Sequence, residues 1–153
     1  MAGHMVATVT RPHPLVRAGC LILGAVSAEL GVWAAFFPRH FYTHFPGAGR
    51  VWVSPDGPYN QHLVRDFGHY NLAFVVLFVG AALTSYRPLR QLVLVAYLVQ
   101  AIPHLVYHAR HLSVYASTDK VLNMVSLGLA VLLPIVLLIV DPQLSKANRS
   151  TTS

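Results

Sequence analysis

The chain has 153 residues, of which 55% are hydrophobic and only 10% are charged. Soluble domains carry about 25% charged residues, so this composition excludes an ordinary soluble domain. The net charge is +6, but the basic residues are scattered at the ends of apolar segments, which argues against a nucleic-acid-binding surface.

Four apolar segments follow a polar N-terminus, 1–14, which contains Gly3-His4-Met5 and is expected to be flexible. They run from about 15 to 37, 62 to 86, 89 to 111 and 120 to 140, and each approaches the roughly 20 residues that a helix needs to cross a bilayer. Cys20, the single cysteine, lies in the first segment, which excludes an intramolecular disulfide. The sequence predicts an all-α fold with one four-helix transmembrane domain, 15–141, and a disordered tail, 142–153.

The connection between the first two segments, 38–60, is the one long loop of the expected bundle. It carries the turn signals Pro46-Gly47 and Asp56-Gly57. It also contains five aromatic residues, Phe41, Tyr42, Phe45, Trp52 and Tyr59. Because aromatic side chains concentrate at the level of the lipid headgroups, we expect an extended loop that caps one end of the bundle.

Four spans place both termini on one side of the membrane, here called the terminal side, opposite the loop side. The basic residues of the terminal side are Arg11, Arg17, Arg87, Arg90, Lys146 and Arg149, and those of the loop side are Arg39, Arg50, Arg65, Arg110 and Lys120. The positive-inside preference therefore favours cytoplasmic termini by six residues to five.

Each expected helix carries its polar residues on one face. These faces follow from about 100° of rotation per residue. The third segment has Tyr97, Gln100, His104 and His108 on one face, and the second has His62, Asp66, His69 and Tyr70. The fourth has Asp119, Asn123 and Ser126, and the first has Glu29. On all four helices the half of the span nearest the loop carries such residues: Glu29, Asp66, His69, His104, His108 and Asn123. We therefore expect them to converge on one polar pocket beneath the loop.

Imidazole and carboxylate groups are ligands for zinc and iron, and histidines at i and i+4 can hold one ion. His104 and His108 have this spacing, so we expect them to bind a metal together with His69 and either Asp66 or Glu29. A metal-bound water could then act as a nucleophile, with Asp66 or Glu29 as the catalytic base.

The remaining polar residues of the pocket, Tyr97, Gln100 and Asn123, would bind the cofactor or orient its ligands. Haem held by paired histidines is a third possibility, and it would require a much larger cavity. The alternative from the same residues is a hydrogen-bonded polar network that fixes helix packing.

Two motifs carry a family resemblance: Pro58-Tyr-Asn-Gln-His-Leu-Val-Arg-Asp-Phe-Gly-His-Tyr-Asn-Leu-Ala73 and Ile102-Pro-His-Leu-Val-Tyr-His-Ala-Arg-His-Leu112. They resemble small four-span actinobacterial membrane proteins of unassigned function, and more distantly DoxX-like four-helix membrane proteins. The resemblance covers roughly 15–140. It implies the four-helix fold and a bacterial inner-membrane location, and it carries no assigned catalytic residues.

The sequence thus predicts an integral membrane protein with a histidine and carboxylate pocket in one leaflet. The leading interpretation is a metal-binding protein, in its fullest form a metal-dependent enzyme acting on a lipid or another hydrophobic small molecule. The alternative is a non-catalytic protein that binds a lipid or small molecule, or an accessory subunit of a membrane complex. Both interpretations allow a homo-oligomer.

Overall fold

A computed structural model describes residues 12–150 of the chain, with side chains to Asp141, and contains four long helices. They are α1 (Pro14–Phe36), α3 (Gln61–Leu83), α4 (Arg87–Arg110) and α5 (Ser117–Ser150). Each is long and apolar enough to cross a membrane, in α5 over Ser117–Asp141. The predicted all-α bundle with four membrane-spanning helices is confirmed, and the protein is an integral membrane protein.

The C-terminal segment is helical where the sequence predicted disorder. Helix α5 continues to Ser150, through most of the segment expected to be disordered. The expected flexible N-terminus falls largely on residues 1–11, including Gly3-His4-Met5, which lie outside the described residues, as do residues 151–153.

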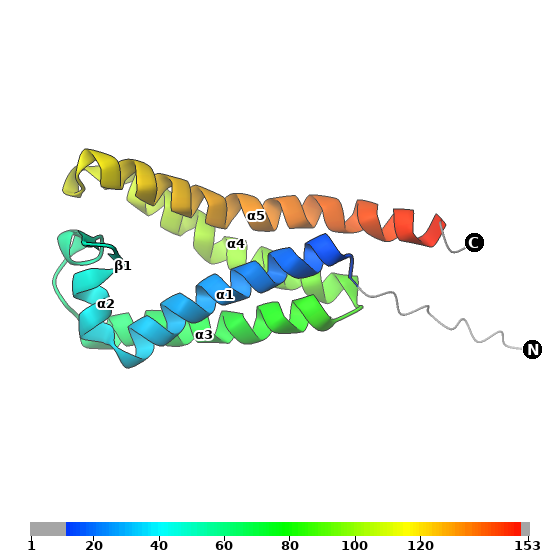
Figure 1. The fold of residues 1–153 in the computed structure, drawn as a ribbon, viewed down its shortest axis with the longest axis horizontal. Helices are drawn as coiled ribbons and strands as arrows, with labels where there is room; N and C mark the ends of the chain where they lie inside the picture. The colour runs from blue at the N-terminus through cyan, green and yellow to red at the C-terminus, as the bar shows by residue number, and fades with distance from the viewer. Residues whose placement is uncertain (1–11, 151–153) are drawn as a thin grey trace, which may run out of the picture.

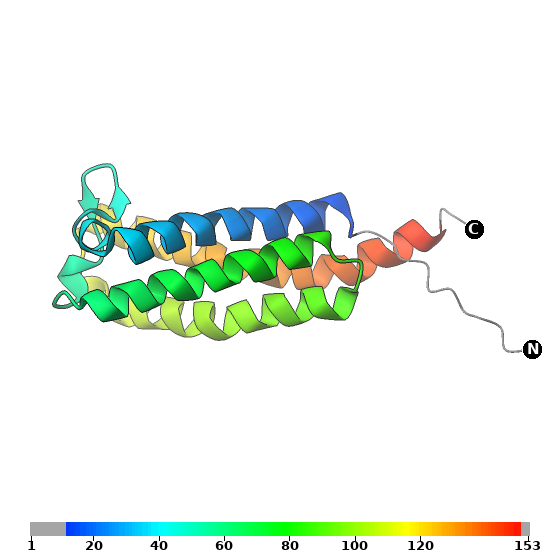
Figure 2. The same ribbon diagram turned by 90° about the horizontal axis from the view of Figure 1, so that it is seen from below.

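The four helices form two antiparallel pairs. Helix α1 packs along α3, and α4 packs along α5, whereas the two pairs contact one another less extensively. The pairs lie close together at the terminal side and diverge toward the loop side (Figure 1). Seen from below, all four helices run along the long axis of the molecule (Figure 2).

Small residues allow α1 and α3 to approach closely. A Cβ atom at Gly68 would overlap the backbone of Ala35, and one at Gly31 would lie 2.9 Å from the Leu72 side chain. Close approach of this kind is how helices gain packing energy in a membrane, where lipid removes the hydrophobic driving force between them. The small residues therefore decide which face of α3 meets α1.

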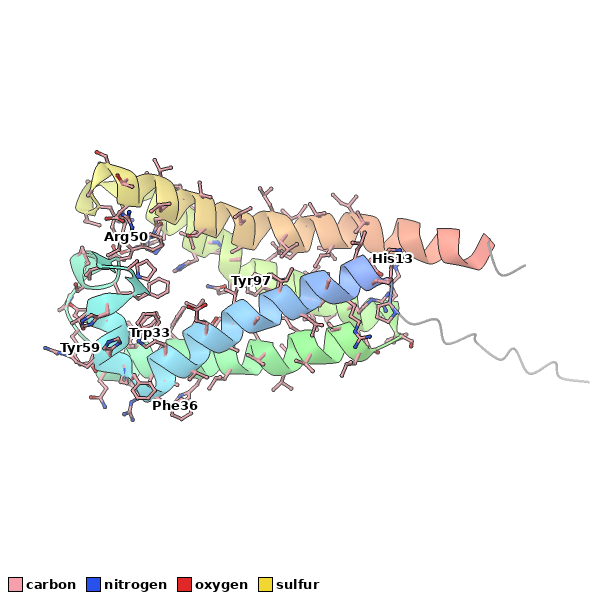
Figure 3. All side chains as sticks on the ribbon, viewed as in Figure 1. His13, Trp33, Phe36, Arg50, Tyr59 and Tyr97 are labelled. Carbon is pink, nitrogen blue, oxygen red and sulfur yellow. The ribbon has the colours of Figure 1, made fainter. Side chains whose placement is uncertain are left out.

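Aromatic contacts join the two helix pairs. The ring of Tyr97 on α4 meets Phe74 and Phe78 of α3 edge-on, with centroids 5.4 and 5.2 Å apart. In Figure 3 Tyr97 lies near the middle of the molecule. This T-shaped geometry is favourable for aromatic pairs and anchors α4 against α3.

The segment 38–60 is folded rather than extended. It contains α2 (Pro38–His44), the antiparallel strands β1 (Pro46–Gly47) and β2 (Arg50–Val51), and the 3₁₀ helix η1 (Ser54–Asp56). A second 3₁₀ helix, η2 (Leu112–Val114), links α4 to α5. Backbone hydrogen bonds within these short elements, and one from Trp52 N to the Phe45 carbonyl at 2.8 Å, hold the segment in this shape.

Helix α2 packs on the loop-side end of α1 through Trp33. The indole Nε1 donates to His40 Nδ1 at 2.8 Å, and the indole ring meets Phe41 and Phe45 edge-on. Trp33 faces α2 in Figure 3. This contact holds the folded segment over the end of the bundle.

Candidate functional site

Asp119, in the first turn of α5, anchors the segment 38–60 to the α4–α5 pair. Its Oδ1 accepts hydrogen bonds from Arg50 Nη1 at 2.6 Å and from Trp52 Nε1 at 3.0 Å. Figure 3 shows Arg50 between the β1–β2 hairpin and α5. Trp52 is only 8% exposed, so this part of the segment 38–60 is packed at the loop-side end of the α4–α5 pair.

Tyr115 extends this anchor to His108 and fixes the tautomer of the imidazole. Its hydroxyl donates to the Trp52 carbonyl at 3.1 Å and lies 3.2 Å from His108 Nδ1. A hydroxyl has one hydrogen to donate, so it accepts from Nδ1–H of His108. The Nε2 atom of His108 therefore carries a free lone pair.

The hydroxyl of Tyr115 keeps its hydrogen across the physiological pH range. Burial, with the nearby Asp56 and Tyr107 as lesser causes, raises the pKa of Tyr115 to about 12. Asp56 itself reaches α4, where Tyr107 donates to its Oδ1 over a long 3.5 Å. The polar network therefore runs from the loop through Tyr115 to α4.

His104 and Asn123 lie farther from the loop than this network, and each side chain has hydrogen-bonding atoms without a partner among the described residues. Arg90 on α4 bonds Asp141 on α5, and His108 bonds Tyr115 just before α5, so the helices are antiparallel and His104 and Asn123 both lie in their loop-side halves. Asn123 is 3% exposed, and its Oδ1 is buried without a hydrogen-bond partner. His104 is half-buried, and among residues 12–141 its ring nitrogens have no hydrogen-bond partner.

His104 also contacts His108, as the i and i+4 spacing predicted. The two rings meet edge-on with centroids 4.7 Å apart. Gln100 is half-buried one turn earlier, and Tyr97 is buried. The structure therefore places the predicted residues of α4 on one buried or half-buried stripe.

Asp66, His69 and Glu29, the ligands predicted from α1 and α3, are exposed rather than buried with His104 and His108 in one pocket. Asp66 pairs with His62 on the outer face of α3 at 3.3 Å, with side chains 54% and 87% exposed. His69 on α3 and Glu29 on α1 are exposed as well. In the described part of the chain, no group of three or more His, Cys, Asp or Glu side chains is arranged to hold a metal.

The physical reason is the packing of α1 on α3. The face of α3 that meets α1 carries Gly68, Asn71 and Phe74, which are buried. Gly68 must face Ala35 because no other residue fits there. The stripe of Asp66 and His69 is on the opposite side of the same helix, so it points away from the bundle.

A buried ion pair at the terminal side was not predicted from the sequence. Arg90 Nη2 lies 2.7 Å from Asp141 Oδ1, and Arg90 Nη1 donates to the Thr84 carbonyl at 3.0 Å. Arg90 was predicted only to be one of the charges that set the topology. The available signal was its place seven residues before Tyr97, on the same buried stripe of α4.

No protein-family model, curated protein or solved structure matches this chain.

Proposed function

We propose that the protein binds a lipid or another amphipathic small molecule through His104 and Asn123, between α4 and α5 in the loop-side half of the span. The unpartnered, buried Oδ1 of Asn123 carries this proposal. Leaving a buried polar group unsatisfied costs about 1–3 kcal/mol. A ligand that donates a hydrogen bond to this oxygen would recover that free energy.

The two side chains define the chemistry of the ligand. The amide oxygen of Asn123 accepts, and a neutral imidazole such as His104 donates through one nitrogen and accepts through the other. The ligand should therefore carry a hydroxyl or amino group. Exposed apolar side chains of α4, Val99, Ile102 and Val106, flank this level of the helix, so the rest of the ligand should be apolar.

Depth in the membrane agrees with an amphipathic ligand. His104 is six residues from the end of α4 at Arg110, which is about 9 Å along the helix axis. This level is near the boundary between headgroups and acyl chains. A ligand with its polar group at His104 keeps its apolar part in the hydrocarbon.

Native mass spectrometry of the detergent-purified protein tests the proposal. The wild type should retain a ligand of discrete mass, and His104→Ala with Asn123→Ala should lose it. Val125→Ala changes an exposed apolar side chain of α5 at a similar level and serves as the matched control, which should retain the ligand. Equal occupancy of the wild type and the double variant, or no bound ligand in the wild type, would contradict the proposal.

A metal ion is the second candidate ligand, and the tautomer of His108 favours it. Metal-binding histidines commonly have one nitrogen fixed by a hydrogen bond and the other free for the ion, as Nδ1 and Nε2 of His108 are here. Zinc or iron bound by His104 and His108 would take its other ligands from water or a bound molecule. Asp66 and Glu29 are exposed, and in the described part of the chain they form no metal-holding group with His104 and His108, so the residues favour binding over metal-dependent catalysis.

Elemental analysis separates the two candidates. Stoichiometric zinc or iron that disappears in His104→Ala with His108→Ala would support the metal. A metal-free protein after attempted loading with either ion would exclude it and leave the amphipathic ligand. A visible absorption band on the same sample would reveal haem.

A further inference from the structure

The segment 38–60 is attached to both helix pairs, and each attachment uses a tryptophan indole. On the α5 side, Trp52 Nε1 donates to the Asp119 carboxylate at 3.0 Å. On the α1 side, Trp33 Nε1 donates to Nδ1 of His40 in α2 at 2.8 Å. The two acceptors differ in chemistry, because an imidazole changes its charge between about pH 5 and pH 8, whereas an ordinary carboxylate stays ionised there.

The hydrogen bond from Trp33 requires a neutral His40. An indole N–H group can only donate, so Nδ1 of His40 must accept with its lone pair. A proton on Nδ1 would occupy that lone pair and remove the acceptor. His40 therefore cannot become a charged imidazolium and keep this bond. His40 is exposed, so protons can reach it from water.

The ring of His44 lies directly on that of His40. The two imidazoles are stacked, with centroids 4.2 Å apart and planes 5° from parallel. Thr43 Oγ1 donates to the Arg39 carbonyl at 2.9 Å, so it accepts from Nδ1–H of His44 at 2.8 Å. The Nε2 atom of His44 then carries the lone pair that can take up a proton. Two protonated rings in such a stack repel one another, so proton uptake favours their separation.

No carboxylate in the described chain is bonded to His40 or His44, so a positive charge there would not be offset. Helix α2 packs against α1, α3 and β2. The titratable groups in the loop-side halves of these elements and in the rest of the segment are Glu29, His62, Arg65, Asp66, His69, Tyr70, Arg50, Asp56 and Tyr59. Within residues 12–141, none of them has a hydrogen bond, ion pair or ring contact with His40 or His44. On α2 itself, Tyr42 donates to the Gly57 carbonyl, and Arg39 is a cation that lies 4.7 Å from the centre of the Tyr59 ring.

We propose that His40 makes the attachment of the segment 38–60 to α1 sensitive to pH. With both imidazoles neutral, the Trp33–His40 hydrogen bond holds α2 on the end of α1. As the pH on the loop side falls and His40 takes up a proton, this bond is lost and α2 loosens. The Trp52–Asp119 bond keeps the segment on α5. The switch lies on α1 and α2, so it does not depend on the ligand proposed for His104 and Asn123.

Hydrogen exchange of the two indole N–H groups, measured by ¹H–¹⁵N NMR of the detergent-purified wild type, tests this switch. The chain has two tryptophans, so Trp33→Phe assigns both signals. Trp52 is the internal control, because the ratio of the Trp33 exchange rate to the Trp52 exchange rate cancels the direct effect of pH on exchange. We expect this ratio to rise roughly fivefold between about pH 8 and about pH 5, as the loss of one hydrogen bond predicts.

Two variants show whether His40 is the responsible group. His40→Gln keeps a side-chain acceptor that does not titrate, so its ratio should be the same at both pH values. His44→Gln removes the other imidazole of the stack and is the matched control, which should keep the rise. A wild-type ratio that does not change, a rise that survives in His40→Gln, or a rise that is lost in His44→Gln would overturn the proposal. Circular dichroism of the wild type should show equal helix content at both pH values, and a general loss of helix at the lower pH would also overturn a local switch.

Discussion

Arg90 and Asp141 form an ion pair in which neither side chain is more than 2% exposed, and the bonded atoms are 2.7 Å apart. The pair joins the start of α4 to α5 at the terminal side, whereas Asp119 and Tyr115 organise the opposite end. The α4–α5 hairpin is thus held by polar contacts at both ends. The proposed ligand site lies near the loop-side contact.

Breaking the terminal ion pair on one side should strongly destabilise the protein. Arg90→Met leaves the Asp141 carboxylate without its guanidinium partner, and loss of one member of a buried pair costs about 3–5 kcal/mol. Arg90→Met with Asp141→Leu should recover much of that loss, because the apolar pair needs no desolvated charge. Circular dichroism recorded during unfolding in detergent measures the free energy of unfolding of both variants.

Arg110→Met is the control for this prediction, because Arg110 is exposed at the other end of α4. It should change the free energy of unfolding little. If Arg90→Met costs no more than Arg110→Met, the ion pair does not stabilise the hairpin.

Removing the carboxylate of Asp119 should release the loop. Asp119→Ala removes the acceptor of both Arg50 and Trp52, so the two hydrogen bonds that join the loop to α5 are lost. Trp33 also contacts the loop, so Asp119→Ala is compared with its parent in a shared Trp33→Phe background, in which Trp52 is the single tryptophan. Its emission should shift to longer wavelength as the indole meets water, and hydrogen exchange of 50–57 should accelerate.

Asp66→Ala is the matched carboxylate control for the loop, since Asp66 pairs with His62 rather than with the loop. It should leave the Trp52 emission unchanged. An unshifted spectrum in Asp119→Ala would show that the loop is held by other contacts.

Tyr115 should ionise at unusually high pH. Burial and the nearby Asp56 raise its pKa from 10.0 to about 12. A raised pKa on an acid means that the contribution of Tyr115 to stability is complete below pH 10.0 and is lost as the pH rises through about 12. The difference in tyrosinate absorbance between the wild type and Tyr115→Phe isolates this group, and a midpoint near 10.0 would contradict its burial.

Gly68→Ala should separate α1 from α3. The added methyl group would overlap the Ala35 backbone, so the helices must move apart, and overpacking costs about 1–3 kcal/mol. Gly128→Ala is the control, because no atom lies within 4 Å of a Cβ there and alanine favours helix by about 1 kcal/mol. Thermal unfolding should therefore fall in the first variant and rise or stay unchanged in the second.

Hydropathy was sufficient to predict the four spans. The helices begin and end within three residues of the expected limits except at the C-terminal end of α5, because the length of an apolar run follows from the thickness of the bilayer. The α4 stripe was also predicted correctly, since His104 and His108 are separated by one turn and meet in the structure.

Periodicity could not show which face of a helix points inward. It grouped Asp66 with His69 correctly on one side of α3 but gave no information on the neighbour of that side. Which face of α3 points inward depends on the contact of Gly68 with Ala35, two residues far apart in the sequence. The Arg90–Asp141 pair was missed for the same reason, because its partners come from different helices.

The central claim is that His104 and Asn123 receive a hydroxyl or amino group of an amphipathic molecule. NMR of ¹⁵N-histidine-labelled protein in detergent, titrated with decanol, tests it most directly, with the His104 signal assigned from His104→Ala. We predict that decanol shifts the NMR signals of the ring nitrogens of His104 but not those of exposed His111. Asn123→Ala should weaken this shift. Decyl methyl ether, which lacks the hydroxyl hydrogen, should cause little change. Equal responses of His104 and His111, or equal effects of the alcohol and the ether, would contradict the account.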